Sequence, residues 1–327
     1  MAVVVARAFH VLGLAPARHV ASGLLRSASV TDFCSELSEL HGEPIAGTAA
    51  EAKVWLAIEY CEPWEAKGVE KAAFPPAVRE RLEAWDEAIE DLRVQLIRRP
   101  GRYGRAPTVL VGVCEPGGGA VVELALESID ALAEVDVPAI VASVRAGQTP
   151  RVGTIVSAPV VLVCTHGKRD RCCAKRGTPV YERMVAHREV VVWQTSHLGG
   201  HRFAATMVWL PHGICYGRVR ADEVDDLVAA LHFGEVFRLD RYRGRSCYAA
   251  AGQAAEAMVR ERFGAMGVDA VVVERAEDLG NGWRVELRAG DRPVVATLEL
   301  ETSSTLSPPS CGKDPEPIEG FALVDLR

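Results

Sequence analysis

Short apolar runs and helically spaced apolar residues follow one another along most of the chain, and this pattern indicates a mixed α/β protein. Residues 53–60 are apolar and rich in β-favouring side chains, which predicts a strand. Residues 75–97 carry apolar side chains at helical spacing and predict an amphipathic helix. Two more strands are expected at residues 108–114 and 120–126, on either side of a glycine-rich turn. Residues 31–155 therefore predict an N-terminal α/β domain.

Residues 156–235 show a denser succession of elements. We expect a strand, a helix, a second strand, a hairpin and a closing helix, at residues 159–164, 178–187, 189–194, 203–219 and 221–233. This order is that of a minimal thioredoxin-like sandwich, in which helices pack on a mixed sheet. The N-terminal domain loosely repeats its first elements. The loops after the first two strands fall at sheet ends, where open α/β sheets hold their sites.

Residues 236–327 predict a C-terminal α/β region. A helix is expected at residues 248–265, followed by strands at 270–273, 283–287 and 294–300. The Ser- and Pro-rich residues 302–317 favour an extended loop. The fold class is therefore α/β (α+β): a thioredoxin-like sandwich flanked by N-terminal and C-terminal α/β units.

Composition limits the functions that this fold can serve. The 327 residues are 49% hydrophobic, with a formal net charge of −7, so nothing attracts the chain as a whole to nucleic acid or to acidic membranes. No apolar run approaches the length of a membrane-spanning helix. Nine cysteines, an odd number spread over the whole length, are untypical of a secreted disulfide framework. We therefore expect a reducing compartment, the cytoplasm.

Residues 1–30 leave a second location open. They contain Arg7, Arg18 and Arg26, and no acidic residue precedes Asp32. Mitochondrial presequences have this composition, and so do disordered extensions of Ala- and Arg-rich chains. We expect a leader or a disordered extension, with the mitochondrial matrix as the alternative location.

Two thiols and two imidazoles form the strongest chemical pattern, Cys164-x8-Cys173-x23-His197-x3-His201. These ligand types suit zinc, copper and iron–sulfur iron alike. The spacing does not fit a zinc finger. It does not fit a Rieske site either, because no His closely follows Cys173 to complete the second half of that motif. Two glycines between the histidines favour a loop over a helical metal pair.

The sequence around these residues resembles the sucrase/ferredoxin-like family. The resemblance is carried by CTHGKRDRCCAKRGTPVYERM and VWQTSHLGGHRFAATMVWLPHGICYGRV, and it extends more weakly to residues 42–64 and 96–102. It implies a thioredoxin-like ferredoxin domain whose 2Fe–2S cluster is bound by Cys164, Cys173, His197 and His201. On this interpretation the protein is an electron carrier or redox sensor. Despite the family name, no carboxylate pair indicates sugar hydrolysis.

Ligand charge predicts how such a cluster would behave. Two thiolates neutralise an oxidised cluster, whereas four would leave it negative, so ligation by histidine should raise the reduction potential. The outer ring nitrogens of His197 and His201 can exchange protons with water, which would make the potential depend on pH.

The neighbouring Cys172 competes with Cys173 for one ligand position. Adjacent side chains diverge on a helix or a strand, so only one of the two is expected to bind the cluster, and the family spacing selects Cys173. We expect the six remaining cysteines to be ordinary buried thiols: Cys34, Cys61, Cys114, Cys215, Cys247 and Cys311. Asp170 is expected to pair with a neighbouring arginine.

A basic zone surrounds the expected cluster. It includes Lys168, Arg169, Arg171 and Arg202, to which Lys175 and Arg176 add further charge. The zone either balances local acids or docks an acidic redox partner protein. Two other functions stay open: a structural or regulatory zinc protein using the same four ligands, and a thiol–disulfide oxidoreductase using Cys172 and Cys173. The sequence does not predict the oligomeric state or the electron donor and acceptor.

Overall fold

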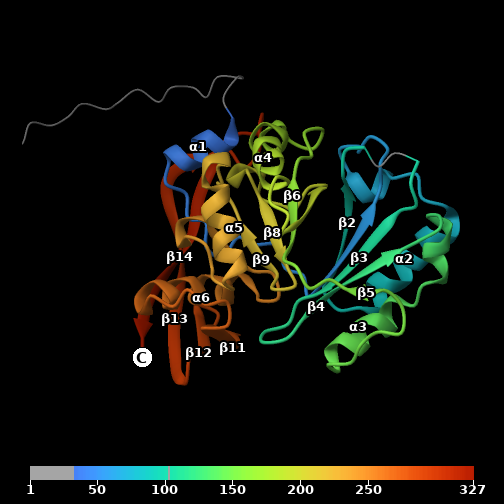
Figure 1. The fold of residues 1–327 in the computed structure, drawn as a ribbon. Helices are drawn as coiled ribbons and strands as arrows, with labels where there is room; N and C mark the ends of the chain where they lie inside the picture. Colours follow the sequence, from blue (N-terminus) through green and yellow to red (C-terminus); the bar gives the residue numbers. More distant parts are fainter. Residues whose placement is uncertain (1–32, 102–103) are drawn as a thin grey trace, which may run out of the picture. The chain divides into compact units, whose positions relative to one another are not determined.

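A ten-stranded mixed sheet forms the centre of the fold (Figure 1), with strand order β10-β9-β8-β6-β7-β2-β1-β3-β4-β5. The computed structural model describes residues 33–101 and 104–327. The expected leader, residues 1–30, lies outside the described residues. Among the described residues, no helix combines the length and apolar character that crossing a membrane requires.

The described residues form six α-helices and two sheets, so the mixed α/β class is confirmed. The helices are α1 (Cys34–Leu40), α2 (Pro76–Ala88), α3 (Val137–Arg145), α4 (Arg171–Met184), α5 (Val224–His232) and α6 (Ala250–Phe263). The strands of the large sheet are β1 (Val54–Glu59), β2 (Leu92–Arg98), β3 (Thr108–Val113), β4 (Ala120–Ala125), β5 (Thr154–Ile155), β6 (Val160–Cys164), β7 (Val191–Thr195), β8 (Met207–Leu210), β9 (Ile214–Tyr216) and β10 (Tyr242–Arg245).

The large sheet contains the same arrangement twice. In the first half, β1, α2, β2, β3, β4 and α3 follow in sequence, with sheet order β2-β1-β3-β4. In the second half, β6, α4, β7, β8, β9 and α5 follow in sequence, with sheet order β7-β6-β8-β9. The first two strands of each half are parallel and the other two neighbour pairs are antiparallel. Each half is therefore a thioredoxin-like unit. The loose repeat of elements noted in the sequence corresponds to a topology that the two halves share.

The two halves join through β2 and β7, which pair antiparallel at Ile97 with Thr195 and Arg98 with Gln194. One sheet thus continues across the division that we expected at residue 155. The three regions of residues 31–155, 156–235 and 236–327 stay a prediction as separate folding domains.

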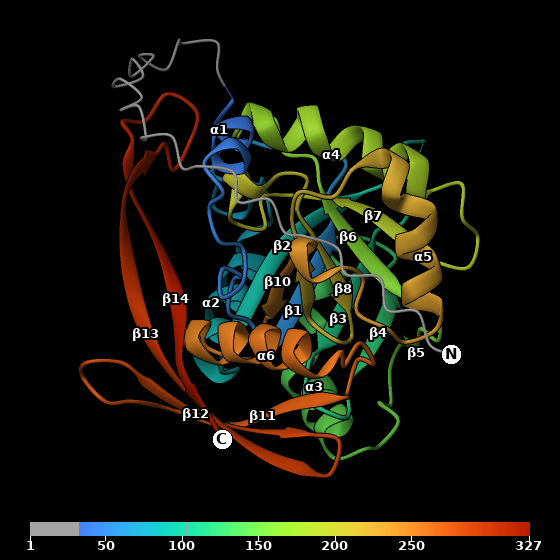
Figure 2. The same ribbon diagram turned by 90° about the vertical axis from the view of Figure 1, so that its left-hand side faces the viewer.

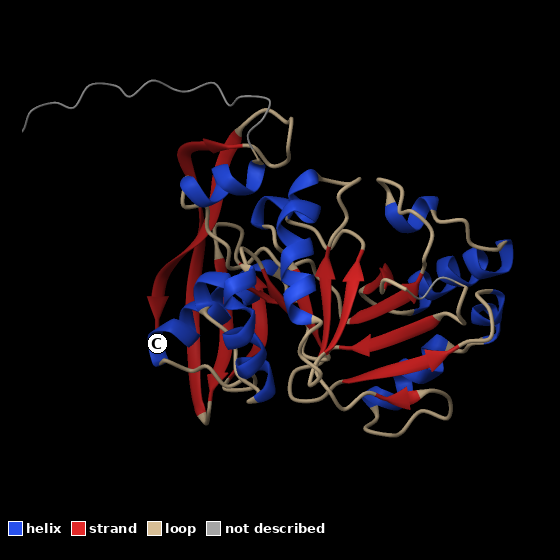
Figure 3. Ribbon diagram, turned by 45° about the horizontal axis from the view of Figure 1, so that its top comes forward, coloured by secondary structure: helices blue, strands red, loops and turns tan. Residues whose placement is uncertain are grey.

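Apolar alternation in β6 explains how helices cover this sheet. Val161 and Val163 contribute to the core that includes side chains of α4 and α5, while Leu162 and Cys164 contribute to the core on the opposite side. All four side chains are fully buried. Figure 3 shows the helices lying against the strands. Protein therefore covers both faces of β6 up to its carboxyl end, where Cys164 lies.

One expected helix was too long. Residues 75–97 were predicted to be helical, but α2 ends at Ala88 and a separate strand begins at Leu92. Asp91 has a positive φ of 54°, which helical geometry does not allow, and turns the chain between them. The apolar residues Leu92, Val94 and Leu96 alternate with polar ones, as expected for the strand that they form.

The second sheet, β11-β12-β13-β14, is antiparallel and packs against α6. Its strands are β11 (Val271–Asp278), β12 (Trp283–Ala289), β13 (Arg292–Ser307) and β14 (Glu316–Leu326). Our prediction of an extended loop over residues 302–317 was wrong at both ends, because β13 and β14 leave only residues 308–315 between them. Much of this hairpin is exposed on both faces, so no apolar alternation marks it in the sequence. Figure 2 shows the hairpin extending to α1.

A buried ion pair on α6 connects the two sheets. Glu256 and Arg260 lie 2.9 Å apart and are both inaccessible to solvent. The hydroxyl of Tyr242 on β10 donates a hydrogen bond to Glu256, and Arg260 donates to the carbonyl of Val268 before β11. The pair is thus part of a satisfied network, and removal of one partner would leave the other charged and buried.

We predict that Glu256→Ala lowers the free energy of unfolding by about 3–5 kcal/mol, because Arg260 would lose its buried counter-ion. Urea unfolding followed by circular dichroism measures this loss. Glu261→Ala, at an exposed position of the same helix, is the matched control and should change stability by less than about 0.5 kcal/mol. Equal effects of the two substitutions would contradict the prediction.

Candidate metal centre

Cys164 and Cys173 come together because α4 lies unusually close to the end of β6. Cys164 is the last residue of β6, and Cys173 lies in the first turn of α4. A Cβ atom placed on Gly177 would be only 2.0 Å from the Cys164 carbonyl oxygen, so only glycine permits this approach. Both thiols are buried, with 0% and 1% exposure.

Asp170 sets where α4 begins. Its side chain accepts a hydrogen bond of 2.8 Å from the Cys172 N–H and caps the helix. We expected this helix to begin at Thr178, but the cap starts it at Arg171. As a result, Cys172 and Cys173 both lie in its first turn and point in different directions.

His197 and His201 lie on the loop after β7, as the two glycines predicted. Gly199 and Gly200 have positive φ values of 91° and 67°, and His201 begins a short 3-10 helix, η3 (His201–Phe203). The buried Arg243 holds this loop by donating a 3.1 Å hydrogen bond to the Gly199 carbonyl. The glycines therefore shape a loop that keeps both imidazoles on one side.

The four predicted ligands are brought together in an unequal way. Ligand atoms of Cys164, Cys173 and His197 all lie within 4.8 Å of one another. The Cys173 Sγ is 3.7 Å from the His197 Nδ1. His201 lies outside this tight group but adjoins it, with its Nδ1 3.4 Å from the His197 Nε2. Two buried thiols and one imidazole thus form a group that could hold a metal, and a second imidazole stands next to it.

Without a metal, the contact between the two thiols favours a thiolate on Cys164 and a protonated Cys173. A hydrogen bond from Cys173 lowers the pKa of the Cys164 thiol far below its usual value, and the same contact raises the pKa of Cys173. Burial lowers the pKa of His201 and keeps its ring neutral near pH 7, so a ring nitrogen is free to bind a metal. Its Nε2 faces the carboxylate of Asp170 at 3.7 Å. A carboxylate behind a histidine ligand is a common means of orienting the ring.

The side chain of His166 holds the backbone of His197 in place: its Nδ1 accepts a hydrogen bond of 3.3 Å from the His197 N–H. Its ring packs edge-on against Trp64 of the first half, with 5.6 Å between ring centroids. A pocket of about 360 Å³ opens beside it, lined by side chains of both halves including Gln95, Ser196 and His197. His197 is therefore the predicted ligand that this pocket reaches.

Cys172 belongs to another group of side chains. Its thiol faces Cys34 and Cys311, and these three cysteines and Asp170 are a second group whose ligand atoms lie within 4.8 Å of one another. A hydrogen bond with Cys34 lowers the pKa of Cys172 to about 6. We expected Cys34 and Cys311 to be ordinary buried thiols; Cys34 is buried, Cys311 is partly exposed, and both lie beside Cys172, a grouping that we did not expect. No sequence signal could have found them, because more than 130 residues separate either one from Cys172.

The basic zone is largely paired with acids. Lys168 contacts Glu65 at 2.6 Å. Lys175 and Arg176 both contact Glu36, at 3.2 and 2.8 Å. Arg202 contacts the buried Glu43 at 2.5 Å. These contacts support the interpretation that the basic zone balances nearby acidic side chains, rather than forming an unpaired positive surface.

Comparison with known proteins agrees with the resemblance seen in the sequence. A profile of the sucrase/ferredoxin-like family matches residues 45–244, more than half of the chain, and the chain therefore belongs to this family. The match covers both thioredoxin-like halves of the large sheet, including every predicted ligand.

Individual relatives match shorter stretches. The altered inheritance of mitochondria protein 32 of Meyerozyma guilliermondii is 34% identical over 99 residues, covering 26% of this chain and 34% of that protein. The match thus spans about a third of the relative's length. Among solved structures, a thioredoxin-like 2Fe–2S ferredoxin from Aquifex aeolicus is similar at 21% identity and a TM-score of 0.22, covering 24% of this chain and 90% of the ferredoxin.

We predict that Gly177→Ala separates Cys173 from Cys164, because the new methyl group would collide with the Cys164 carbonyl. The variant should unfold at a lower temperature than the unmodified protein, and any metal that the unmodified protein binds at this group should be lost. Gly252→Ala on α6 is the control, since a Cβ there meets its neighbours at an ordinary 3.4 Å. Metal content and thermal unfolding of both variants measure the effect. Full metal content in Gly177→Ala would show that the close approach is not needed.

Proposed function

We propose that this protein is an iron–sulfur protein that transfers electrons or senses redox state, with a 2Fe–2S cluster on Cys164, Cys173, His197 and His201. The observation that carries the proposal is the meeting of two buried thiols with His197 within 4.8 Å, with His201 next to it. These residues lie at the ends of the neighbouring strands β6 and β7 and in the segments that follow them, where open α/β sheets hold their ligands. Family membership supports the same assignment.

The donor set fits such a cluster. Thiolates are the usual ligands of iron–sulfur iron, and two imidazoles can replace two of them, as they do in Rieske centres. The cluster would supply one-electron redox chemistry. Around it, the chain buries Cys164 and Cys173 against water and keeps His201 neutral. The pocket reaches His197, and we propose that electrons pass to a partner on that side.

The two alternatives find less support in these contacts. A zinc protein would use the same thiols, and His201, which stands outside the tight group, would be its weakest ligand. A thiol–disulfide exchange by Cys172 and Cys173 would need their sulfurs to face each other. Instead, Cys172 contacts Cys34 and Cys311, while Cys173 contacts His197. These contacts therefore speak against thiol–disulfide exchange, while the zinc alternative uses the same four residues and is separated from the iron–sulfur proposal by family membership and by metal content.

Purified protein should be red-brown, with visible absorption bands that bleach on addition of dithionite. Cys173→Ser should lose these bands, because it removes a thiolate that lies 3.7 Å from His197. Cys247→Ser, which changes a thiol outside both groups of side chains, is the control and should keep them. Absorption spectra and iron content check both variants. Colourless protein with zinc on Cys164 and Cys173 would overturn the proposal.

The reduction potential should fall as pH rises from 6 to 9, because the reduced cluster binds a proton more strongly on its histidine ligands. One proton per electron gives a slope of about 59 mV per pH unit at 25 °C. His197→Cys and His201→Cys should each keep a cluster, lower its potential and flatten the slope, since a thiolate adds negative charge and lacks an ionisable ring. Spectroscopic redox titration measures all three effects. A potential that does not change with pH in the unmodified protein would contradict this prediction.

We further propose that an acidic redox partner protein docks near the centre, by competing for the cations that Glu36, Glu43 and Glu65 now hold. Electron transfer to such a partner would slow with rising salt. The cysteine content supports a reducing compartment such as the cytoplasm. The mitochondrial matrix remains the alternative, with which the name of the mitochondrial inheritance relative is compatible.

A further inference from the structure

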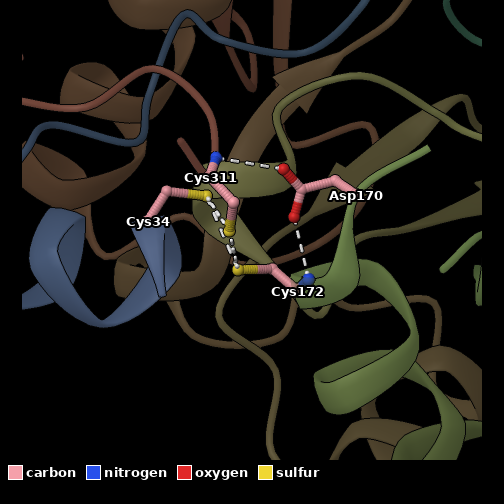
Figure 4. A group of neighbouring side chains, drawn as sticks. All are labelled: Cys34, Asp170, Cys172 and Cys311. Carbon is pink, nitrogen blue, oxygen red and sulfur yellow. Dashed lines mark hydrogen bonds between the residues drawn. The ribbon is translucent and has the colours of Figure 1, made fainter. Parts of the chain in front are cut away.

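Three thiols meet at a second place, outside the proposed cluster site. The Sγ atoms of Cys34, Cys172 and Cys311 form a triangle with sides of 3.5, 3.3 and 3.6 Å. They come from α1, from the first turn of α4 and from the loop of residues 308–315. Figure 4 shows the three sulfur atoms pointing toward one another, with the carboxylate of Asp170 beside them.

The dimensions of this triangle fit one metal ion. A zinc ion about 2.3 Å from each of three thiolates holds neighbouring sulfurs about 3.8 Å apart in a tetrahedral site. The observed sides are shorter than that value by about 0.2 to 0.5 Å, so the ion would need the sulfurs to move apart by only about half an ångström or less. An iron–sulfur cluster with several irons would instead spread the thiolates further apart, because each would bind a different iron.

Asp170 supplies a fourth ligand position. Its side chain is almost fully buried, and its carboxylate lies within 4.8 Å of all three sulfurs. One oxygen caps α4, while the other accepts hydrogen bonds from the Cys311 N–H and the Ser310 hydroxyl. These bonds fix the carboxylate in place, as partners of metal-binding carboxylates commonly do.

We propose that Cys34, Cys172, Cys311 and Asp170 bind one zinc ion. A set of three thiolates and one carboxylate is within the ligand range of Zn²⁺, whereas a soft ion such as Cu⁺ would gain little from the oxygen. The ion would enter as Zn²⁺ while the three thiols release three protons, without any change of oxidation state. This site shares no ligand with the proposed cluster and does not depend on it.

The zinc ion would connect three distant parts of the chain. Cys34 and Cys311 are 277 residues apart, and Cys172 lies between them in sequence. The first of these segments, α1, packs against η3, which begins at His201. The loop of residues 308–315 also contacts His201, through the backbone of Pro309. The ion would therefore hold in place two segments that surround His201, α1 and the loop of residues 308–315.

Metal analysis of the purified full-length chain tests this proposal. We expect about one zinc per chain, as for a closed structural site, whether or not iron is also present. Cys34→Ser and Cys311→Ser should each lose the zinc. Two controls should keep it: Cys164→Ser, which removes a ligand of the other site, and Cys247→Ser, which changes a thiol outside both groups. Zinc that remains while iron is lacking would sink only the cluster proposal.

Two further measurements on the unmodified protein keep the test independent of variant folding. X-ray absorption at the zinc edge should show three sulfur ligands and one oxygen ligand. Alkylation followed by mass spectrometry should find Cys34, Cys172 and Cys311 protected until a chelator removes the metal. Protein without zinc, a disulfide between two of the three, or zinc that is lost with Cys164→Ser and kept with Cys34→Ser would overturn the proposal.

Discussion

The buried carboxylate of Asp170 is the group around which both sets of ligands are arranged. Burial of a charged side chain is unfavourable unless it is fully hydrogen-bonded, and Asp170 meets this condition with the N–H groups of Cys172 and Cys311 and the hydroxyl of Ser310. By capping α4 it places two adjacent cysteines in one helical turn, from which they diverge. Cys173 then faces His197, Cys172 faces Cys34, and the carboxylate itself stands between His201 and Cys311.

The junction between the two halves positions the histidine loop of the proposed centre. The second half contains every predicted ligand, but the loop after β7 is positioned by contacts with the first half. The Ser196 N–H donates a hydrogen bond to the Leu96 carbonyl of β2, while the Ser196 hydroxyl accepts one from the Leu96 N–H and donates one to the Gln95 side chain. His197 follows directly, so the junction of β2 with β7 determines where this ligand lies. Two thioredoxin-like units of the same topology thus form a ligand-bearing half and a half that supports it.

Sequence patterns predicted most elements of the second half because its strands are short, apolar and buried on both faces. The patterns failed for elements whose side chains are exposed, because such elements leave no apolar pattern in the sequence. β14 and the outer part of β13 pair through their backbones while many of their side chains stay in solvent, so their sequence resembles a loop. The start of α4 was also missed, since Gly177 and Pro179 are poor helix formers. Its cap and its close packing on β6 override that preference.

The sequence alone determined the spacing of Cys164, Cys173, His197 and His201, the glycines that make the histidine segment a loop, and the family. These are local properties, set by residues within one or two elements. Only the tertiary structure decided that Cys172 turns away from Cys173 toward Cys34 and Cys311. That grouping unites thiols as far as 277 residues apart, and no local pattern records it, because it arises from how α1, α4 and the β13–β14 hairpin pack together.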